Sequence, residues 1–472
     1  MTVATATGLV ATVDVAHEGS AKRIGPRTDA ADLRVWTGTP LRLALVVGRE
    51  NADRAAASAA ALGACADIVL TLAANGRESF IERATAIREA DPDAVLIVAG
   101  SRDQNGVIDV VEALRAATAG RPKPPVVLIA SDERTRARIA PSLAPLALEA
   151  IPGPTAALAR EGIVARLRGM RRPAGDIVLR DEAVESAARA VAAADMRDTL
   201  VLDVSGASTS LALATPTGAV IALHSHLGVG TNADRVVART GLDRVRRWVP
   251  RAVDGPALLE RVFNRARWPD AVPATTLTLA LEMALAREAV AHTLRDAERS
   301  GISVAPFRAA RAIVCTGRIA RFPRAAQCAI VAIDALETRG TTCLSREAPD
   351  ALIAAGAIAS RGSADIAGRI EPLAIAITLW PRRAMTLTVS DATGTIEQRI
   401  TRGAFLLMPT TGRVDLRVGG SAETASADAL ALGVIVDVRG RPLDLPQRDA
   451  ERLPALARWH SALTALSSEG LV

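Results

Sequence analysis

Between residues 41 and 131 short apolar runs alternate with longer helical patterns, and this alternation constrains the fold more than any other feature. The runs "LRLALVVG", "ADIVLTLA", "DPDAVLIVAG" and "PPVVLIAS" have the length of buried strands. Between them, "ADRAAASAAALGA" and "VIDVVEALRAATA" have helical composition and spacing. Strands that alternate with helices in this way form a mainly parallel sheet with helices on both faces. The sequence therefore predicts an α/β fold.

The second half of the chain has a different pattern. The pattern of residues 199–227 predicts strands joined by tight turns, and that of residues 275–301 predicts one long helix. From about residue 375, apolar and polar residues alternate between Gly and Thr turns, which predicts a small antiparallel β-domain. The predicted divisions are a poorly patterned segment 1–40, an α/β region 41–180, a hairpin-and-helix region 181–375 and a β-rich domain 376–472.

Composition argues against a nucleic-acid partner. Aromatic residues make up 2% of the 472 residues and Tyr is absent, so a surface that stacks bases on aromatic rings is not supported. The net charge of +6 comes from Arg residues scattered among Asp and Glu rather than gathered in runs. The core must be built from Ala, Val, Leu and Ile.

The cysteines and histidines of the sequence do not indicate a metal centre. The four cysteines lack CxxC spacing, which is typical of reduced core residues in a cytoplasmic protein. His224 and His226 would share one strand face, but no third ligand is evident. The chain starts without a secretory signal pattern, and no apolar run reaches membrane length. We therefore expect a cytoplasmic protein with no membrane partner.

The stretch "LVLDVSGAST" (residues 200–209) carries the strongest functional pattern. Asp203 ends an apolar strand, and Gly206 allows a tight turn and the close approach of a ligand. The turn could direct backbone amides and two hydroxyls at phosphate, from Gly206, Ala207, Ser208 and Thr209. Asp203 could hold Mg²⁺ through water. The alternative is an ordinary Ser/Gly turn in which Asp203 caps backbone amides.

Two further segments bear on the same site. In "IVCTGRIARFP" (residues 313–323) a strand ends at Thr316 and Gly317, where the adenosine of a nucleotide would lie in a two-lobed phosphate-hairpin fold. Its alternative is a plain strand-to-helix turn. The segment "LGVGTNADRV" (residues 227–236) is either a helix N-terminus that faces an anion or a helix capped by Asn232 or Thr231.

In their order and spacing these segments resemble the glutamate (methylaspartate) mutase accessory proteins of the MutL type, which are unrelated to the mismatch-repair protein of that name. The resemblance covers roughly residue 41 to the C-terminus. The quoted matches are "VLDVSGASTSLALA", "HLGVGTNADRVVA", "TGRIARFPRAAQCAIVAIDAL", "DALIAAGAIAS" and "ALGVIVDVRGRPL". The hairpin and the ending "GVIVDVRGRPL" (residues 433–443) are the most specific.

The resemblance implies an actin/Hsp70/sugar-kinase (ASKHA) architecture, with ATP between two RNase H-like lobes, and a C-terminal β-domain. Residues 41–180 would belong to the first lobe and residues 181–375 to the second. It also implies an ATP-driven reactivating chaperone whose partners are the subunits of an adenosylcobalamin-dependent mutase. Asp203 would be the catalytic and Mg²⁺-binding residue, Gly206 to Thr209 would bind phosphate, and Thr316 with Gly317 would contact adenosine.

This chain departs from the family pattern at several positions. Ser205 and Ser210 replace the first Gly and the last Asp of Asp-x-Gly-Gly-Ala-Thr-Thr-Asp, and Arg318 replaces a second Gly at the adenosine turn. The segment "AGSRDQNG" (residues 99–106) interrupts a Gly-rich run. The nearest candidate for a first-lobe phosphate loop, residues 13–22, has the wrong spacing. Catalysis in this superfamily needs two loops around one nucleotide, because it depends on positioning and charge stabilisation.

Three functions follow as hypotheses. The first is an ATP-dependent accessory chaperone of an adenosylcobalamin-dependent mutase. The second is a non-hydrolysing homologue that serves as a binding or scaffold protein for such a mutase. The third is a small-molecule kinase, for which the sequence offers no identifiable general base.

Overall fold

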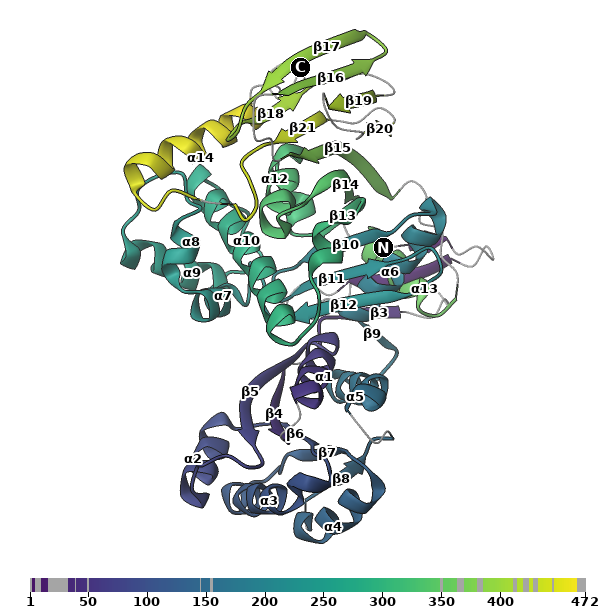
Figure 1. Cartoon of the computed structure of the whole chain (residues 1–472), viewed down its shortest axis with the longest axis vertical. Helices are drawn as coiled ribbons and strands as arrows, with labels where there is room; N and C mark the ends of the chain where they lie inside the picture. Colours follow the sequence, from purple (N-terminus) through teal and green to yellow (C-terminus); the bar gives the residue numbers. More distant parts are fainter. Residues whose placement is uncertain are drawn as a thin grey trace.

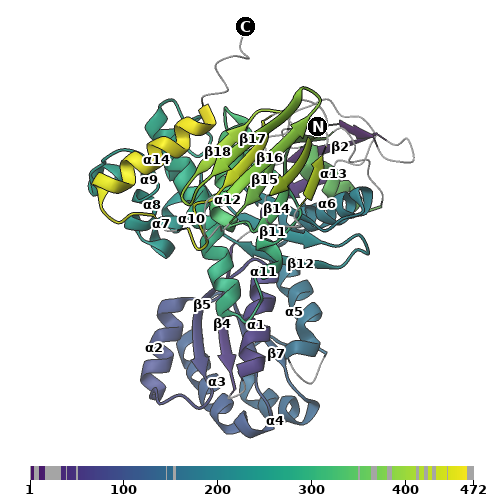
Figure 2. The same ribbon diagram turned by 45° about the horizontal axis from the view of Figure 1, so that its top comes forward.

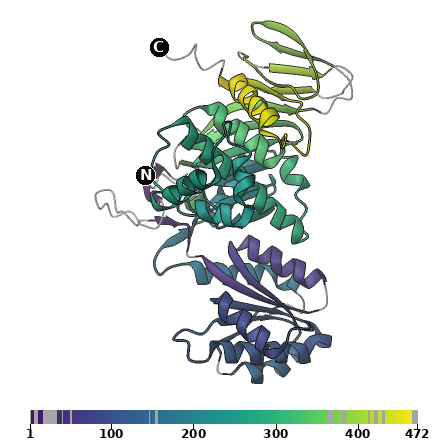
Figure 3. The ribbon, with the colours of Figure 1, turned by 90° about the vertical axis from the view of Figure 1, so that its left-hand side faces the viewer.

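The structure is a computed structural model of the chain. It describes residues 2–4, 10–15, 33–38, 40–48, 51–144, 146–152, 156–348, 351–362, 369–379, 385–410, 414–418, 424–427, 432–443 and 445–464. Figures 1 and 3 show three parts stacked along the longest axis: an α/β domain at one end, a central sheet with its helices, and a small β-sheet at the other end. Among the described residues, no helix is both long and apolar enough to cross a membrane.

The α/β domain at one end contains a five-stranded parallel sheet in the order β5-β4-β6-β7-β8. Its strands are β4 (Leu41–Val47), β5 (Ala66–Ala73), β6 (Ala94–Val98), β7 (Val126–Ala130) and β8 (Leu148–Ala150). Its helices are α1 (Asn51–Gly63), α2 (Phe80–Ala90), α3 (Gln104–Thr118), α4 (Glu133–Leu143) and α5 (Ala156–Arg171), with the 3₁₀ turn η1 (Ser101–Asp103). Helices α2, α3 and α4 pack on one face of the sheet, and α1 and α5 pack on the other (Figure 2). The alternating pattern of the sequence predicted this arrangement correctly.

A small sheet shows how this domain joins the rest of the chain. Its order is β1-β2-β3-β9, formed by β1 (Thr2–Ala4), β2 (Val10–Val15), β3 (Leu33–Trp36) and β9 (Ile177–Leu179). β3 and β9 pair directly in parallel, although about 140 residues separate them in the sequence. The α/β domain is thus an insertion between two neighbouring strands. The sequence analysis separated a poorly patterned segment, 1–40, from an α/β region, 41–180. In the structure β3, from residues 1–40, pairs with β9, from residues 41–180.

The central sheet has eight strands in the order β12-β11-β10-β13-β14-β15-β21-β18. Its strands are β10 (Thr199–Val204), β11 (Thr209–Ala214), β12 (Val220–Ser225), β13 (Ala312–Gly317), β14 (Gly340–Glu347), β15 (Ile370–Thr378), β18 (Phe405–Met408) and β21 (Gly433–Asp437). β10, β11 and β12 form antiparallel hairpins, while β13 runs parallel to β10 and β14 parallel to β13. The five strands β12-β11-β10-β13-β14 have the order of an RNase H-like lobe, and β15, β21 and β18 extend this sheet. The predicted α/β fold class is confirmed.

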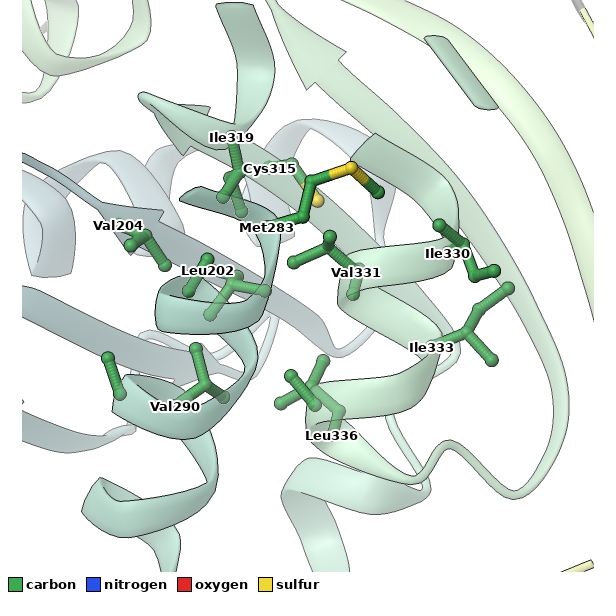
Figure 4. Close-up of a cluster of buried hydrophobic side chains, with 14 of the residues drawn as sticks. Leu202, Val204, Met283, Val290, Cys315, Ile319, Ile330, Val331, Ile333 and Leu336 are labelled. Carbon is green, nitrogen blue, oxygen red and sulfur yellow. The ribbon is translucent and has the colours of Figure 1, made fainter. Parts of the chain in front are cut away.

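Helices cover both faces of the central sheet. They are α6 (Arg180–Asp195), α7 (Ala233–Thr240), α8 (Leu242–Arg246), α9 (Gly255–Arg267), α10 (Thr276–Arg299), α11 (Ala305–Arg308), α12 (Ala325–Leu336) and α13 (Ala351–Ala359), with the 3₁₀ turn η2 (Ile319–Arg321). α6 and α13 lie between the small sheet and one face of the central sheet. α10 and α12 pack on the opposite face, where Val290, Val331 and Leu336 face Leu202 and Cys315 (Figure 4). The long helix predicted for residues 275–301 is α10.

The C-terminal region is divided between two sheets. A separate four-stranded sheet, in the order β17-β16-β19-β20, contains β16 (Met385–Asp391), β17 (Gly394–Ile400), β19 (Val414–Val418) and β20 (Thr424–Ala427). β18 and β21 instead extend the central sheet, and α14 (Asp449–Thr464) packs beside β18. The predicted β-rich ending is therefore present, but part of it completes the central sheet.

Buried charges join the inserted domain to the central part. Arg171 of α5 donates to the carbonyl oxygens of Thr37 and Ala64 at 2.7 Å each, and to Asp181 of α6 at 3.0 Å. Burial alone would raise the pKa of Asp181, but the charges of Arg171, His224 and Arg168 outweigh it and hold this pKa well below its usual value. Nearby, burial and the charges of Arg171 and Arg235 lower the pKa of His226 from 6.5 to about 3.

We expect His226 to make the protein less stable in mild acid. Above pH 6.5 this imidazole is neutral in both the folded and the unfolded chain. Below 6.5 only the unfolded chain takes up the proton, so the free energy of unfolding falls as the pH drops from 6.5 toward 3. Urea unfolding of the wild type and of His226→Gln, at pH values on either side of 6.5, measures this effect. The variant should show a clearly smaller pH slope, and an unchanged slope would contradict the assignment.

Candidate functional site

The turn between β10 and β11 is closed by its own hydrogen bonds. The Ser205 hydroxyl accepts hydrogen bonds from the backbone amides of Ala207 at 3.2 Å and Ser208 at 2.9 Å. The Ser205 amide donates to the Ser208 carbonyl at 2.8 Å, and the Thr209 hydroxyl donates to the Leu227 carbonyl at 2.7 Å. The amides of Ala207 and Ser208 and the hydroxyl of Thr209, all predicted to bind phosphate, are thus hydrogen-bonded within the protein.

The loop before α7 holds this turn from outside. The amides of Val229 and Gly230 donate to the carbonyl oxygens of Ser205 and Gly206, at 3.0 and 2.9 Å. Asn232, at the N-cap position of α7, donates from its side chain to the Ala207 carbonyl at 2.6 Å and makes no side-chain capping bond. The Asn232 side chain therefore braces the hairpin and does not cap α7, while an anion at this helix N-terminus stays a prediction.

The predicted adenosine turn lies directly beside the hairpin. Parallel pairing of β10 with β13 sets Asp203 opposite Thr316 and Val204 opposite Gly317. Gly317 has φ +73°, and a Cβ there would lie 2.6 Å from both Asp203 Oδ1 and the Val204 carbonyl oxygen, so only Gly fits. The Thr316 hydroxyl donates to the buried carboxylate of Glu347, which also accepts from the Gly317 amide at 2.9 Å. The two predicted segments thus meet in space.

Asp203 has a partner that the sequence pattern did not reveal. Arg180, the first residue of α6, donates from Nε and Nη2 to Oδ2 and Oδ1 of Asp203, each at 2.8 Å. Asp203 is fully buried and Arg180 is 4% exposed. Such a paired, two-bond contact between guanidinium and carboxylate is the strongest ion-pair geometry that proteins form. No motif marks Arg180, since it is one of many Arg residues and lies 23 positions before Asp203.

A pocket of about 210 Å³ opens over these residues. Arg180, Ser205, Gly206 and Gly317 form part of its wall. The other lining residues are Asp270, Val272, Pro273, Leu279, Glu282, Arg318, Arg321, Phe322 and Pro323. Of the predicted site residues, Gly206 and Gly317 line this pocket, together with three guanidinium groups and an apolar side. The lining does not include the others, which are Asp203, Ala207, Ser208, Thr209 and Thr316.

Arg318, which replaces a family Gly, reaches across this pocket. Its amide donates to the Val204 carbonyl at 2.7 Å. Its guanidinium donates to the Pro269 carbonyl and lies 3.9 Å from Glu282, which Arg265 also pairs at 3.0 Å. Arg318 therefore fastens the segment before α10 to the hairpin side of the pocket.

The residues around Asp203 fit Mg²⁺ poorly. Mg²⁺ takes oxygen ligands and is usually held by one or two carboxylates, but both oxygens of Asp203 accept hydrogen bonds from Arg180. Ser210, opposite Asp203 on β11, stands where the family has its second carboxylate. Within the described residues, no group of three or more His, Cys, Asp or Glu is arranged to hold a metal ion. The Mg²⁺ role of Asp203 stays a prediction that this arrangement does not favour.

Other predicted features lie away from this pocket. In the candidate first-lobe loop, Asp14 belongs to β2, whereas Gly19 and Ser20 lie outside the described residues. "AGSRDQNG" follows β6 and leads into α3, in the inserted domain. His224 bonds Glu185 at 3.0 Å, and the four cysteines are free thiols.

No protein-family model and no curated protein sequence matches this chain. Solved structures align with parts of it. The activator of the 2-hydroxyisocaproyl-CoA dehydratase from Clostridium difficile, with bound ADPNP, is 12% identical over 54% of this chain and 80% of its own, with a TM-score of 0.21. The Ppx/GppA phosphatase of Aquifex aeolicus is 9% identical over 46% of this chain and 52% of its own, at 0.16. Nucleotide-free acetone carboxylase is 13% identical over 92% of this chain and 75% of its own, at 0.23.

TM-scores of this size carry no functional conclusion. The fold class follows from the strand order of the molecule itself, an RNase H-like sheet with an inserted α/β domain and a separate β-sheet near the C-terminus. The α/β fold class predicted from the sequence is therefore the fold class of this chain.

Proposed function

We propose that this chain is an accessory protein of an adenosylcobalamin-dependent mutase of the glutamate mutase type, and that it binds a nucleotide without hydrolysing it efficiently. The observation that supports the nucleotide part is the parallel pairing of β10 with β13, which brings Gly206 of the hairpin and Gly317 of the predicted adenosine turn to one pocket. The mutase partner rests on the resemblance of the quoted segments.

Two contacts favour the non-hydrolysing form over an ATP-driven chaperone. Arg180 occupies both oxygens of the carboxylate expected to hold Mg²⁺. The Ser205 hydroxyl occupies two amides expected to hold phosphate. Hydrolysis depends on groups positioned around the transferred phosphate. We therefore expect the chain to bind the nucleotide but to hydrolyse it very slowly. A kinase would need a general base in the pocket, where the carboxylates are Glu282, paired with Arg265, and the largely exposed Asp270.

Thermal unfolding with ATP, ADP or adenosine tests the nucleotide part. A ligand that binds only the folded chain raises its stability by about 2.7 kcal/mol at a hundred times the dissociation constant. We expect a saturable rise in Tm with ATP and ADP, a smaller rise with adenosine, and phosphate release no faster than in buffer. No rise with either nucleotide would refute nucleotide binding, and rapid phosphate release would reinstate the ATP-driven chaperone.

The partner is tested separately. Size-exclusion chromatography of the chain with the subunits of a glutamate-mutase-type enzyme, loaded with inactive cobalamin, should give a joint peak. The control is the same mixture with an unrelated α/β protein of similar size. Separate elution under all nucleotide conditions would remove the mutase from the proposal while leaving nucleotide binding open.

A further inference from the structure

We propose that two copies of this chain form a two-fold dimer, in which the α2 tip of each copy docks into the Trp268 groove of the other. The α2 tip is the exposed pair Phe80 and Ile81, at the start of α2. The Trp268 groove is the pocket between the end of α9 and the start of α10. This inference goes beyond the proposed function and depends on neither the nucleotide nor the mutase.

The Trp268 groove is a pocket of about 320 Å³ with a mainly apolar wall. The end of α9, residues 271–274 and the first turns of α10 form this wall, which includes Trp268 and Val272. Trp268 is 63% exposed, Val272 is 80% exposed, and Phe263 of α9 is 54% exposed. Exposed apolar side chains that gather in one patch mark binding surfaces, and Trp is enriched among the residues that dominate binding energy.

The α2 tip is a second patch of this kind. Phe80 and Ile81 are neighbours in the sequence and are 51% and 75% exposed. Of the eight large apolar side chains that are exposed in the described part of the chain, five belong to these two patches. The other three, Met196, Ile221 and Ile396, are far apart in the sequence. Docking of one patch on the other would remove both from water.

The α2 tip is held rigidly by the cap of its helix. The Ser79 hydroxyl accepts a hydrogen bond from the Glu82 amide at 3.3 Å, and the Glu82 carboxylate accepts one from the Ser79 amide at 2.7 Å. This capping box fixes the first turn of α2, which carries both apolar side chains. A rigid apolar projection loses little conformational entropy when it docks.

The wall of the Trp268 groove carries one positive charge that is not neutralised. Its charged residues are Arg261, Arg265 and Glu282. Arg265 pairs with Glu282 at 3.0 Å, whereas no carboxylate among the described residues pairs with Arg261. The groove therefore favours an apolar group with a carboxylate beside it. Other charged side chains are exposed nearby but do not line the groove: Glu260, Arg267 and Asp270.

The α2 tip has carboxylates on both sides. Glu78 and Glu82 are exposed there, as is Arg77, whereas Arg83 is buried and lies 4.0 Å from Glu78. Hydrogen bonds within the capping box lower the pKa of Glu82, so this carboxylate is charged at neutral pH. We therefore expect Glu82 to pair with Arg261 of the second copy when the α2 tip fills the groove.

The two patches lie on the same side of the molecule. α2 of the inserted domain and α9 of the central part are both at the left in Figures 1 and 2. One two-fold axis can therefore set α2 of each copy against α9 of the other, so that both contacts form at once. A closed dimer buries both patches in both copies, whereas a single contact would leave one patch of each kind exposed.

Sedimentation velocity of the full chain over micromolar concentrations tests this inference. We expect the mean mass to rise with concentration from that of one chain to that of two, and no further. Trp268→Ser and the double variant Phe80→Ser/Ile81→Ser should each associate at least about thirtyfold more weakly, the effect of one hot-spot side chain. Ile396→Ser, at a half-exposed apolar residue of β17, is the matched control and should dimerise normally. A wild type that stays monomeric would overturn the inference.

Mixing the two variants shows which surfaces meet. All three substituted side chains are more than half exposed, so the variants should fold like the wild type. Trp268→Ser keeps its α2 tip, and Phe80→Ser/Ile81→Ser keeps its groove. Labelled Trp268→Ser should therefore bind an excess of the double variant in a fluorescence titration, but not an excess of unlabelled Trp268→Ser. Equal binding in the two titrations, or dimers that persist in either variant alone, would overturn the inference.

Discussion

Replacing Asp437 with Ala should destabilise the protein by about 3–5 kcal/mol, the usual cost of breaking a buried ion pair from one side. Asp437 ends β21 and is fully buried. Its carboxylate accepts hydrogen bonds from Nε and Nη2 of Arg439, at 3.0 and 2.8 Å, and from Nη2 of Arg441 at 2.7 Å. Burial would raise the pKa of Asp437, but the charges of Arg439 and Arg441 outweigh it and lower this pKa to about 2.

The loss is large because the neighbouring cations have few other anions. Arg439 also pairs with Asp334 at 2.6 Å, and Asp334 in turn pairs with Arg287 at 2.9 Å. Without Asp437, Arg439 and Arg287 share the carboxylate of Asp334, and Arg441 loses the carboxylate that it pairs with. Arg439 is further enclosed by the rings of Phe405 and Trp459, at 4.1 and 4.7 Å from their centres, so it cannot easily reach water.

Urea unfolding at neutral pH measures the Asp437→Ala effect. The control is Glu371→Ala, which removes one partner of a pair whose side chains are 49% and 23% exposed; it should cost no more than about 1 kcal/mol. Equal, small losses in both variants would mean that the buried network does not stabilise the fold.

The second large effect is expected for Gly228→Ala. A Cβ at this position would lie 2.2 Å from the Gly206 carbonyl oxygen and 2.5 Å from the Ala207 amide nitrogen. Both are backbone atoms of the hairpin turn, so relief requires the loop and the turn to separate. We expect a loss of about 3 kcal/mol, at the upper end for overpacking.

Differential scanning calorimetry of Gly228→Ala and Gly100→Ala measures this effect. Gly100 is the matched control, because a Cβ added there would meet no heavy atom within 4 Å beyond its chain neighbours, and its φ of −84° suits any residue. Equal Tm values for Gly228→Ala and Gly100→Ala would show that the loop before α7 does not pack tightly on the hairpin.

Local patterns predicted much of this molecule. Apolar runs such as the one ending at Asp203 predicted strands, and the spacing of residues 275–301 predicted α10, because both signals are complete within one segment. The Thr316–Gly317 turn was expected near the hairpin only through comparison with a two-lobed phosphate-hairpin fold, and the parallel pairing of β10 with β13 does bring the two together.

Pairings between distant segments could not be predicted. Arg180 carries no pattern that distinguishes it from other Arg residues, yet it determines the electrostatics around Asp203. The same holds for the amide of Gly230, which meets the hairpin through backbone atoms alone. Likewise, β18 and β21 have the alternation of a small β-domain, and only their partners place them in the central sheet.

The inserted domain begins after β3 and ends before β9, and the guanidinium of Arg171 makes contacts at both connections. Arg171 donates to the Thr37 carbonyl, just after β3, at 2.7 Å, and to Asp181, just after β9, at 3.0 Å. It also binds the Ala64 carbonyl inside the domain at 2.7 Å. Arg168 of α5 also pairs with Asp181 and Glu185 of α6, and Asp67 of β5 pairs with Arg235 and Arg239 of α7. Rotation of this domain would have to break several of these ion pairs, so the two connecting segments alone do not set its position.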